Sequence, residues 1–262
     1  MQMIKGLIRL AQTLQFNILS YWFRHYSRRV MIVSDRPSLI IAPHQDDETL
    51  GCGGLITLKR QLGVRVAVVF LTDGGGTCVS LSDYEHEVNL RRQEAIAALN
   101  LLGVPGSDIH FLNYPDGKLQ NLSASDRQDL LTQLQQLLEQ YEAEEVYAPH
   151  AKDGHCDHEA AFQLAYTATV SSRIQLFQYP IWLFWRRSFL LQLKWRDLAG
   201  AYRLNIGSVS SKKQRAIRIY QSQLSILPFG FLNPFWSSTE LFFVQAMPKP
   251  EQETLAINAR KR

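Results

Sequence analysis

One segment constrains the fold of this chain more than any other: residues 39–55, LIIAPHQDDETLGCGGL. It begins with the apolar run Leu39–Ala42, continues with His44, Asp46 and Asp47, and then enters a glycine-rich turn. Charged groups beside an apolar strand are costly unless they are paired or bind a metal. In open α/β sheets, ligands bind beyond the carboxyl ends of the strands. The segment therefore predicts a buried strand that ends in a functional site.

Beyond Pro37, apolar runs typical of strands alternate with segments of helical periodicity. The predicted strands are Leu39–Ala42, Arg65–Leu71, Ile109–Leu112, Glu145–Ala148 and, near the end of the chain, Leu241–Ala246. The predicted helices are Gly54–Leu62, His86–Leu102, Ser125–Tyr141, His158–Thr169 and Lys212–Leu224. This alternation favours a parallel sheet with crossover helices. We therefore predict a single α/β domain with a Rossmann-like, mostly parallel sheet flanked by helices.

The sequence also predicts segments that flank or interrupt this domain. Residues 1–34 have the pattern of an amphipathic, basic N-terminal helix, residues 35–247 form the α/β domain, and residues 248–262 form a polar tail. Within the domain, residues 177–206 are rich in aromatic and basic side chains and match no recognisable motif. We predict that this last segment is an insertion on the substrate side, at a membrane contact or at a dimer surface.

The charge of the chain is unevenly distributed, although its net value is only +4. Residues 1–34 carry five basic and no acidic residues, residues 35–185 carry ten basic and twenty acidic ones, and residues 186–218 carry nine basic and one acidic. Basic segments of this kind suit an anionic surface, such as a membrane leaflet or a phosphate-bearing substrate. Nucleic acid is not expected as a partner.

The N-terminal helix has two interpretations. Lys5, Arg9, Gln12 and Gln15 interrupt its apolar residues, so it is not expected to span a membrane. Its apolar face can lie on a membrane surface, with Trp22 and neighbouring aromatic residues at the interface. Alternatively, the same face packs on the domain. Both interpretations stay open from the sequence alone.

The three cysteines of the chain have no regular spacing, which favours a reducing compartment without disulfides. We therefore expect a cytoplasmic protein, with peripheral contact at the inner face of the membrane as an extension of that expectation. The sequence does not indicate an oligomeric state.

A second cluster of chemically active residue types follows a later predicted strand. Residues 150–158, HAKDGHCDH, contain three histidines and two aspartates directly after the strand that ends at Ala148. The carboxyl ends of parallel strands meet at one edge of a sheet, so this cluster is expected beside the first. Two histidines and one carboxylate form a ligand set that leaves positions open for water at a catalytic metal.

With both clusters identified, the chain resembles the PIG-L/LmbE-like family of zinc-dependent de-N-acetylases. The family pattern is His-Pro-Asp-Asp-Glu after the first strand and His-x-Asp-His after a later one. This chain has PHQDDE at Pro43–Glu48 and HCDH at His155–His158. Gln45 and Cys156 replace prolines that are common in the family. The resemblance covers residues 37–245, with further matches at Leu71–Gly74, Arg91–Glu94, Leu101–Val104, Tyr114–Gly117 and Lys213–Gln223.

The resemblance implies a metal site and a small catalytic set. His44, Asp47 and His158 would ligate Zn²⁺, with Fe²⁺ or another divalent cation as alternatives. Asp46 would be the general base, and His155 would stabilise the oxyanion or protonate the leaving amine.

Three further roles follow from the same resemblance. Asp157 would act in catalysis by orienting or tuning a neighbouring histidine. Arg91 and Asp116 are candidate substrate-binding residues. The alternatives are a solvated or helix-pairing arginine at Arg91 and a turn residue at Asp116.

These residue types suit the hydrolysis of an amide. An amide carbonyl is unreactive, so hydrolysis needs an activated water, which a metal supplies at neutral pH. A carboxylate within reach takes the proton and returns it to nitrogen. A metal together with a protonated imidazole would stabilise the negative charge of the tetrahedral intermediate.

The predicted function is therefore metal-dependent removal of the N-acetyl group from an N-acetylglucosamine-type glycoconjugate, with a lipid- or phosphate-linked acceptor as a hypothesis. Two alternatives remain open at this point. Two histidines and one carboxylate also suit a non-haem Fe(II) oxygenase. A non-catalytic sugar-binding protein on the same fold is the other.

Overall fold

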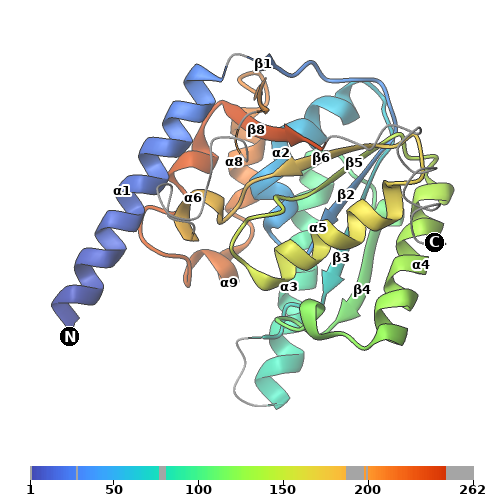
Figure 1. Ribbon diagram of the computed structural model, residues 1–262, viewed down its shortest axis with the longest axis horizontal. Coiled ribbons are helices and arrows are strands. Elements are labelled where there is room, and N and C mark those ends of the chain that lie inside the picture. Colours follow the sequence, from blue (N-terminus) through green and yellow to red (C-terminus); the bar gives the residue numbers. More distant parts are fainter. Residues whose placement is uncertain (1, 28, 77–80, 187–197, 199, 246–262) are drawn as a thin grey trace, which may run out of the picture.

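The computed structural model describes residues 2–27, 29–76, 81–186, 198 and 200–245 (Figure 1). In this part of the chain, the strands form one eight-stranded sheet with the order β1-β7-β8-β6-β5-β2-β3-β4. The strands are β1 (Arg29–Val30), β2 (Ser38–Ala42), β3 (Val66–Thr72), β4 (Ile109–Tyr114), β5 (Glu145–Pro149), β6 (Gln175–Tyr179), β7 (Ala201–Asn205) and β8 (Thr239–Val244).

The sheet is mostly parallel. β2 pairs in parallel with β3 and β5, and β3–β4 and β5–β6 extend the parallel block on either side. β8 runs antiparallel between β6 and β7. The predicted α/β class and the mostly parallel sheet are confirmed.

Helices cover both faces of this sheet. They are α1 (Gln2–Tyr26), α2 (Asp47–Gln61), α3 (Leu81–Leu102), α4 (Ala124–Gln140), α5 (Cys156–Thr169), α6 (Leu183–Arg186), α8 (Ser210–Ile217) and α9 (Gln221–Leu224), with 3₁₀ turns η1 (Gly106–Asp108), η2 (Leu119–Asn121) and η3 (Asn233–Trp236). Among these described helices, each is too short or too polar to cross a membrane.

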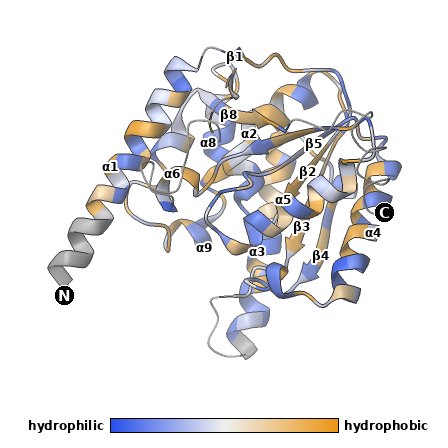
Figure 2. Ribbon diagram, viewed as in Figure 1, coloured by the Kyte–Doolittle hydropathy of each residue, from blue (hydrophilic) through white to orange (hydrophobic). Residues whose placement is uncertain are grey.

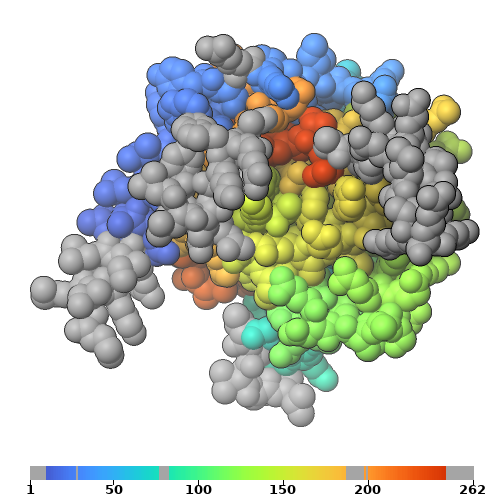
Figure 3. Space-filling view, viewed as in Figure 1, coloured from blue at the N-terminus to red at the C-terminus, as the bar shows by residue number. Residues whose placement is uncertain are grey.

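Alternation along the strands sends side chains into two separate cores. Ile40 of β2 and Val68 of β3 pack in the core that α1, α2, α3 and α8 cover, whereas Ile41 and Val69 pack in the core under α4 and α5. Both strands are fully buried, as expected for a parallel sheet with helices on both faces. In Figure 3, the yellow and green atoms of α5 and α4 lie in the centre and lower part of the face toward the viewer.

The strand order places the topological switch point between β2 and β5. From β2 the chain proceeds to β3 and β4 on one side, and from β5 it proceeds to β6 on the other. At such a point the connections leave in opposite directions and open a crevice beyond the carboxyl ends of the strands. The segments after β2 and β5, which carry the two predicted clusters, border this crevice.

The prediction of a glycine-rich turn after Glu48 is wrong, because Gly51, Gly53 and Gly54 belong to α2. Gly51 and Gly54 are buried within the helix, which begins at Asp47 and not at Gly54. A Cβ atom on Gly51 would lie 2.3 Å from Cδ2 of Tyr179. The glycines therefore allow α2 to approach the sheet closely, and this packing outweighs the low helix propensity of glycine.

Two other segments differ from the predicted pattern. The helix expected at Lys212–Leu224 is divided into α8 and α9 by a break at Arg218–Tyr220. The segment 177–206, predicted as an insertion, supplies part of β6 and all of β7 to the sheet. Residues 187–197 and 199 of that segment, and the polar tail at 248–262, lie outside the described residues.

Candidate metal centre

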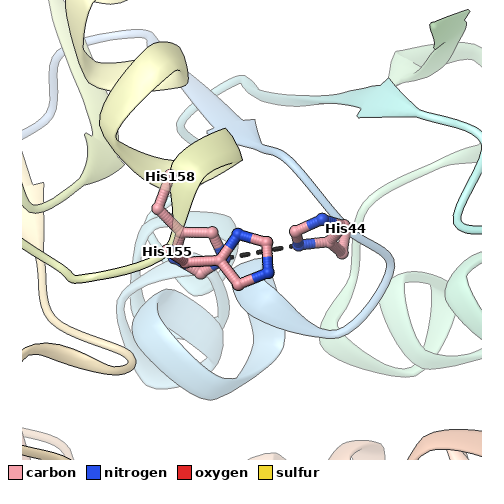
Figure 4. A group of neighbouring side chains, drawn as sticks. All are labelled: His44, His155 and His158. Carbon is pink, nitrogen blue, oxygen red and sulfur yellow. Dashed lines mark hydrogen bonds between the residues drawn. The ribbon is translucent and has the colours of Figure 1, made fainter. Parts of the chain in front are cut away.

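The loops after β2 and β5 bring both predicted clusters to the switch point. His44 lies two residues beyond β2, and His155 and His158 lie at the start of α5. One ring nitrogen from each of the three histidines comes within 4.8 Å of the others, and Figure 4 shows the rings close together. The two clusters therefore form one site, as the edge rule for parallel strands predicts.

Within this site, three potential ligand atoms form a small triangle. Nδ1 of His44 lies 3.2 Å from Oδ2 of Asp47 and 3.3 Å from Nε2 of His158. Nε2 of His158 lies 3.3 Å from the same oxygen of Asp47. All three side chains are buried. The atoms converge on one point, and His44 and Asp47 also line the cavity described below.

Neighbouring carboxylates fix the tautomers of the two rings. Nδ1 of His158 lies 2.7 Å from Asp153, and Nε2 of His44 lies 3.2 Å from Asp157. An ionised carboxylate only accepts hydrogen bonds, so the facing ring nitrogens carry the protons. In their neutral forms, both rings then direct a lone pair toward Asp47, so three acceptor atoms face one another.

The electrostatics of the triangle favour added positive charge. Burial lowers the pKa of His158, but Asp47 and Asp153 outweigh it and raise that pKa to about 9. Burial raises the pKa of Asp47, but His158 and His44 hold it well below its usual range. The same carboxylates that raise the pKa values of the histidines would stabilise a cation in place of the protons.

The donor set and its spacing fit zinc. Two imidazole nitrogens and one carboxylate oxygen are the ligands of one common class of catalytic zinc sites. With metal–ligand bonds of about 2.0–2.1 Å and tetrahedral angles, the ligand atoms would stand about 3.3–3.4 Å apart. The observed separations are 3.2, 3.3 and 3.3 Å. The triangle therefore matches a tetrahedral zinc ion with one position left for a fourth ligand.

Asp46 occupies a strained position beside the triangle. It is the N-cap residue of α2 with φ 145°, in a region that residues other than glycine rarely adopt. Its side chain lines the cavity that opens on His44 and Asp47. Burial and the neighbouring charge of Asp47 raise the pKa of Asp46 to about 8. A carboxyl group with such a pKa takes up a proton readily near neutral pH.

Glu48 and Tyr220, which the sequence analysis assigned no role, support this position. Oε2 of Glu48 accepts a hydrogen bond of 3.2 Å from the backbone N–H of Asp46. The hydroxyl groups of Thr49 and Tyr220 donate to the other oxygen of Glu48. Glu48 is fully buried, so this network ties the strained backbone at Asp46 to the segment between α8 and α9.

Asp153 is a third residue for which the sequence predicted no role. Its carboxylate is fully buried and accepts hydrogen bonds from the backbone N–H groups of Ile181, Trp182 and Leu183 as well as from His158. Carboxylates that hold a ligand histidine in this way set its orientation and basicity. The available sequence signal was its place in the histidine-rich segment, five residues before His158.

Replacing Asp153 by asparagine is expected to weaken zinc affinity by about 10–100-fold, because the neutral amide no longer fixes and polarises His158. Competition with a chromogenic chelator measures the change. Asp108→Asn is a matched control, since Asp108 is also buried but lies at η1, away from the site. An equal affinity in Asp153→Asn and Asp108→Asn would contradict the role of Asp153.

The two candidate substrate-binding residues, Arg91 and Asp116, both line the cavity, and Asp116 also contacts the predicted ligand His44. Asp116 contacts Nε2 of His44 at 3.1 Å, and its other oxygen accepts from the N–H of Gly76. Arg91 donates to the carbonyl of Gly74 at 2.8 Å and lies 3.9 Å from Asp116. Asp116 therefore orients His44 together with Asp157, while Arg91 presents a buried cation to the cavity wall.

His155 differs from the expectation of a protonated imidazole. Burial and the neighbouring charges of His158, His44 and Arg186 lower the pKa of His155 to about 3. The ring is therefore neutral near pH 7. Any stabilisation of an oxyanion by His155 comes from an N–H hydrogen bond and not from a full positive charge.

A cavity of ≈ 370 Å³ leads from solvent to the site. Its polar wall carries His44, Asp46, Asp47 and Arg91. The rest of its lining includes the apolar side chains of Trp182, Ile226, Leu227 and Phe231, with the Arg186 guanidinium 4.6 Å from the centre of the Trp182 ring. The cavity thus combines a reactive end with an aromatic wall.

The two departures from the family pattern have different consequences. The side-chain amide of Gln45 is buried and donates to the carbonyl of Thr72 at 2.9 Å, which fastens the loop after β2 to the end of β3. Cys156 is an exposed free thiol at the first position of α5. Burial on one side and the charge of Asp157 raise the pKa of the Cys156 thiol.

Comparison with known proteins agrees with the resemblance. A family profile described as PIG-L, GlcNAc-PI de-N-acetylase, matches residues 39–169, which is half of the 262-residue chain. This match includes every predicted ligand and catalytic residue of the site.

Two curated relatives share part of the sequence. The chain is 32% identical over 132 residues to the uncharacterized deacetylase YaiS of Escherichia coli, a match that covers 50% of this chain and 66% of the relative. It is 37% identical over 82 residues to the diacetylchitobiose deacetylase of Thermococcus kodakarensis, which covers 31% of this chain and 30% of the relative. The chain thus spans less than two thirds of the length of each.

Among solved structures, the N,N'-diacetylchitobiose deacetylase of Pyrococcus horikoshii has the same fold. The TM-score is 0.61 at 23% identity, and the match covers 90% of this chain and 97% of that chain. The fold, the motif order and the family profile lead to one assignment: the chain belongs to the PIG-L family of GlcNAc-PI de-N-acetylases.

Proposed function

We propose that this protein is a zinc-dependent hydrolase that removes the N-acetyl group from an N-acetylglucosamine-type glycoconjugate, releasing acetate and a free amine. The observation that carries the proposal is the triangle of His44, Asp47 and His158. Three buried acceptor atoms face one another at the spacing of zinc ligands, next to a carboxyl group with a raised pKa. A purely structural cluster would not require a base of this kind at its edge.

A divalent cation held by the triangle supplies Lewis acidity, which makes water a nucleophile near neutral pH. In our proposal, Asp46 accepts the proton of that water and later delivers it to the amide nitrogen. The neutral His155 donates a hydrogen bond to the developing oxyanion. Asp157 holds His44 by accepting a hydrogen bond from its Nε2–H, and the N–H groups of Gly117 and Leu119 donate to Asp157 in turn.

The substrate class is supported by relatives and by the cavity. Two of the similar proteins, from Thermococcus kodakarensis and Pyrococcus horikoshii, are diacetylchitobiose deacetylases, whose substrate carries N-acetyl groups on sugar rings. The aromatic wall at Trp182 suits the apolar face of a sugar ring, and Arg91 and Asp116 can position hydroxyl groups. We extend the proposal to a lipid- or phosphate-linked acceptor, because Arg186 and the apolar residues Ile226 and Leu227 line the cavity.

The proposed location is a reducing compartment, the cytoplasm, with peripheral contact between α1 and a membrane. The free thiols of Cys52 and Cys156 agree with a reducing environment. Fe²⁺ is the alternative metal, since the same ligand set suits it.

The deciding experiment measures acetate release from soluble, nucleotide-linked and lipid-linked N-acetylglucosamine conjugates. The protein is first treated with a chelator and then restored with Zn²⁺ or Fe²⁺. We expect release only after a metal is restored, from at least one conjugate. Bound metal without release from any conjugate would favour a sugar-binding protein, and turnover that requires O₂ would favour an oxygenase.

A further inference from the structure

An apolar strip runs along α1 and continues onto the loop after α9. On α1, Leu10, Leu14 and Ile18 recur every four residues and are 57%, 54% and 64% exposed. On the loop, Ile226 and Phe229 are 60% and 95% exposed. Side chains of this size usually bury most of their surface in a folded protein. Their common exposure on neighbouring segments marks a contact surface. We call these five residues the apolar strip.

Two residues of the loop after α9 connect the strip to the catalytic cavity, because they line both that cavity and a hollow beside α1. A hollow of ≈ 530 Å³ lies between α1 and the loop, lined by Leu10 and Phe229 together with Ile226 and Leu227. Ile226 and Leu227 also line the catalytic cavity. In Figures 1 and 2, α1 and the largely hydrophobic loop near α9 lie on the same side of the molecule. Ile226 therefore belongs both to the strip and to the lining of the catalytic cavity.

The other face of α1 anchors the helix to the domain. Phe16 stacks on Phe231 with ring centroids 5.2 Å apart, and Phe23 stacks on Phe184 at 5.3 Å. The apolar residues of α1 thus lie on two surfaces of the helix. One is buried against the domain, and the strip on the opposite side is left exposed. The interpretation that the helix packs on the domain therefore holds for one face of α1, and the opposite face is exposed.

Charge and aromatic residues indicate what the strip contacts. Residues 1–34 contain five basic and no acidic residues; of these, Arg24 is buried and donates to the carbonyl of Thr239, whereas Arg29 is exposed. Toward the end of α1, Tyr21, Trp22 and Tyr26 are 59%, 43% and 61% exposed and border a further hollow of ≈ 610 Å³. Basic residues with exposed Trp and Tyr rings beside an apolar face are typical of helices at a membrane interface. A second copy of the same cationic helix would be repelled.

We propose that the apolar strip docks on the surface of an anionic lipid bilayer, so that the catalytic cavity opens at the lipid headgroups. Ile18 and Phe229 insert at the interface, while the net positive charge of the N-terminal segment attracts anionic lipid. The docking itself is independent of catalysis. Its use, access to sugars carried on membrane lipids, rests on the proposed function.

The test uses the full-length protein with vesicles of phosphatidylcholine alone or mixed with phosphatidylglycerol, followed by sedimentation. We expect binding to the mixed vesicles that weakens at high salt, and little binding to phosphatidylcholine alone. The double variant Ile18→Glu/Phe229→Glu should lower the partition coefficient by at least about tenfold, because two apolar anchors become anionic.

Leu62→Glu is the matched control. Leu62 is also 62% exposed, but it follows the last residue of α2, at the end of the helix away from the site. It should bind vesicles like the unchanged protein. Equal thermal unfolding and equal release of acetate from a soluble conjugate in all three proteins establish that fold and active site are intact.

Three results would overturn the docking: no binding of the unchanged protein to anionic vesicles, equal binding by the double variant, or a dimer in sedimentation velocity that the double variant dissociates. Vesicle binding by a protein without deacetylase activity would refute the proposed function and leave the docking in place. Deacetylation of soluble conjugates without vesicle binding would refute the docking and leave the proposed function in place.

Discussion

The substitution Asp46→Asn is expected to lower the rate of acetate release by about 10²–10⁴-fold while leaving the metal bound. Asparagine has nearly the same shape as aspartate but cannot accept a proton from water. Asp46 lines the cavity, whereas the acceptor triangle consists of His44, Asp47 and His158. The loss should therefore appear in kcat and not in metal content.

Measurement of kcat together with metal per protein tests this expectation. Asp129→Asn on α4 is the control. Asp129 is exposed, and α4 packs on the core that it shares with α5, on the face of the sheet that α2 does not cover. It should change neither quantity. Full activity in Asp46→Asn would exclude Asp46 as the base, and loss of metal from that variant would place it among the ligands instead.

The pH profile provides a second readout of the same residue. A base works only when deprotonated, so the rate should rise with pH through the pKa of Asp46. Burial and the charge of Asp47 raise this pKa to about 8, and a divalent cation beside it would lower the value again. The acidic limb of kcat/KM should therefore lie below pH 8 in the zinc protein and disappear in Asp46→Asn. A limb above pH 8 would contradict this assignment.

Local sequence signals predicted the framework of the site well. The apolar runs of β2, β3 and β5 are found within two residues of their predicted bounds, because buried parallel strands are continuous hydrophobic segments. Of the predicted ligands, His44 and Asp47 follow β2 directly, and His158 lies in the first turn of the helix after β5. The rule that parallel strands end at one edge was sufficient to expect them together, although 114 residues separate His44 from His158.

The remainder depends on contacts that no local pattern encodes. Tyr220 bonds to Glu48 across 172 residues, and only the folded chain brings α8 and α9 to the start of α2. From the sequence, Gly51 is typical of a turn. In the structure it lies in α2, where the ring of Tyr179 occupies the space that a Cβ atom would need. The strands β1, β6 and β7 were missed for a similar reason. β7 pairs antiparallel with β8, and its sequence, AYRLN, is less uniformly apolar than the sequences of the central strands β2 and β3.

The substitution Asp47→Asn is expected to have the opposite signature to Asp46→Asn, although the two residues are neighbours and the chemical change is identical. It removes the only negative charge among the three ligand atoms, at a buried position where His44 and His158 hold the carboxyl group ionised. We expect zinc affinity to fall by more than about 100-fold, beyond the effect of an outer carboxylate. Acetate release should then be lost together with the metal.

Thermal unfolding with and without zinc separates this variant from its neighbour without any substrate. A metal that binds only the folded state at 100 times its Kd adds about 2.7 kcal/mol of stability. Zinc should therefore raise the Tm of the unchanged protein and of Asp46→Asn, and leave that of Asp47→Asn nearly unchanged. If zinc raises the Tm of Asp47→Asn as strongly as that of Asp46→Asn, Asp47 is not a ligand. The grouping of His155 with His44 and His158, whose nitrogens also lie within 4.8 Å of one another, would then describe the metal site better.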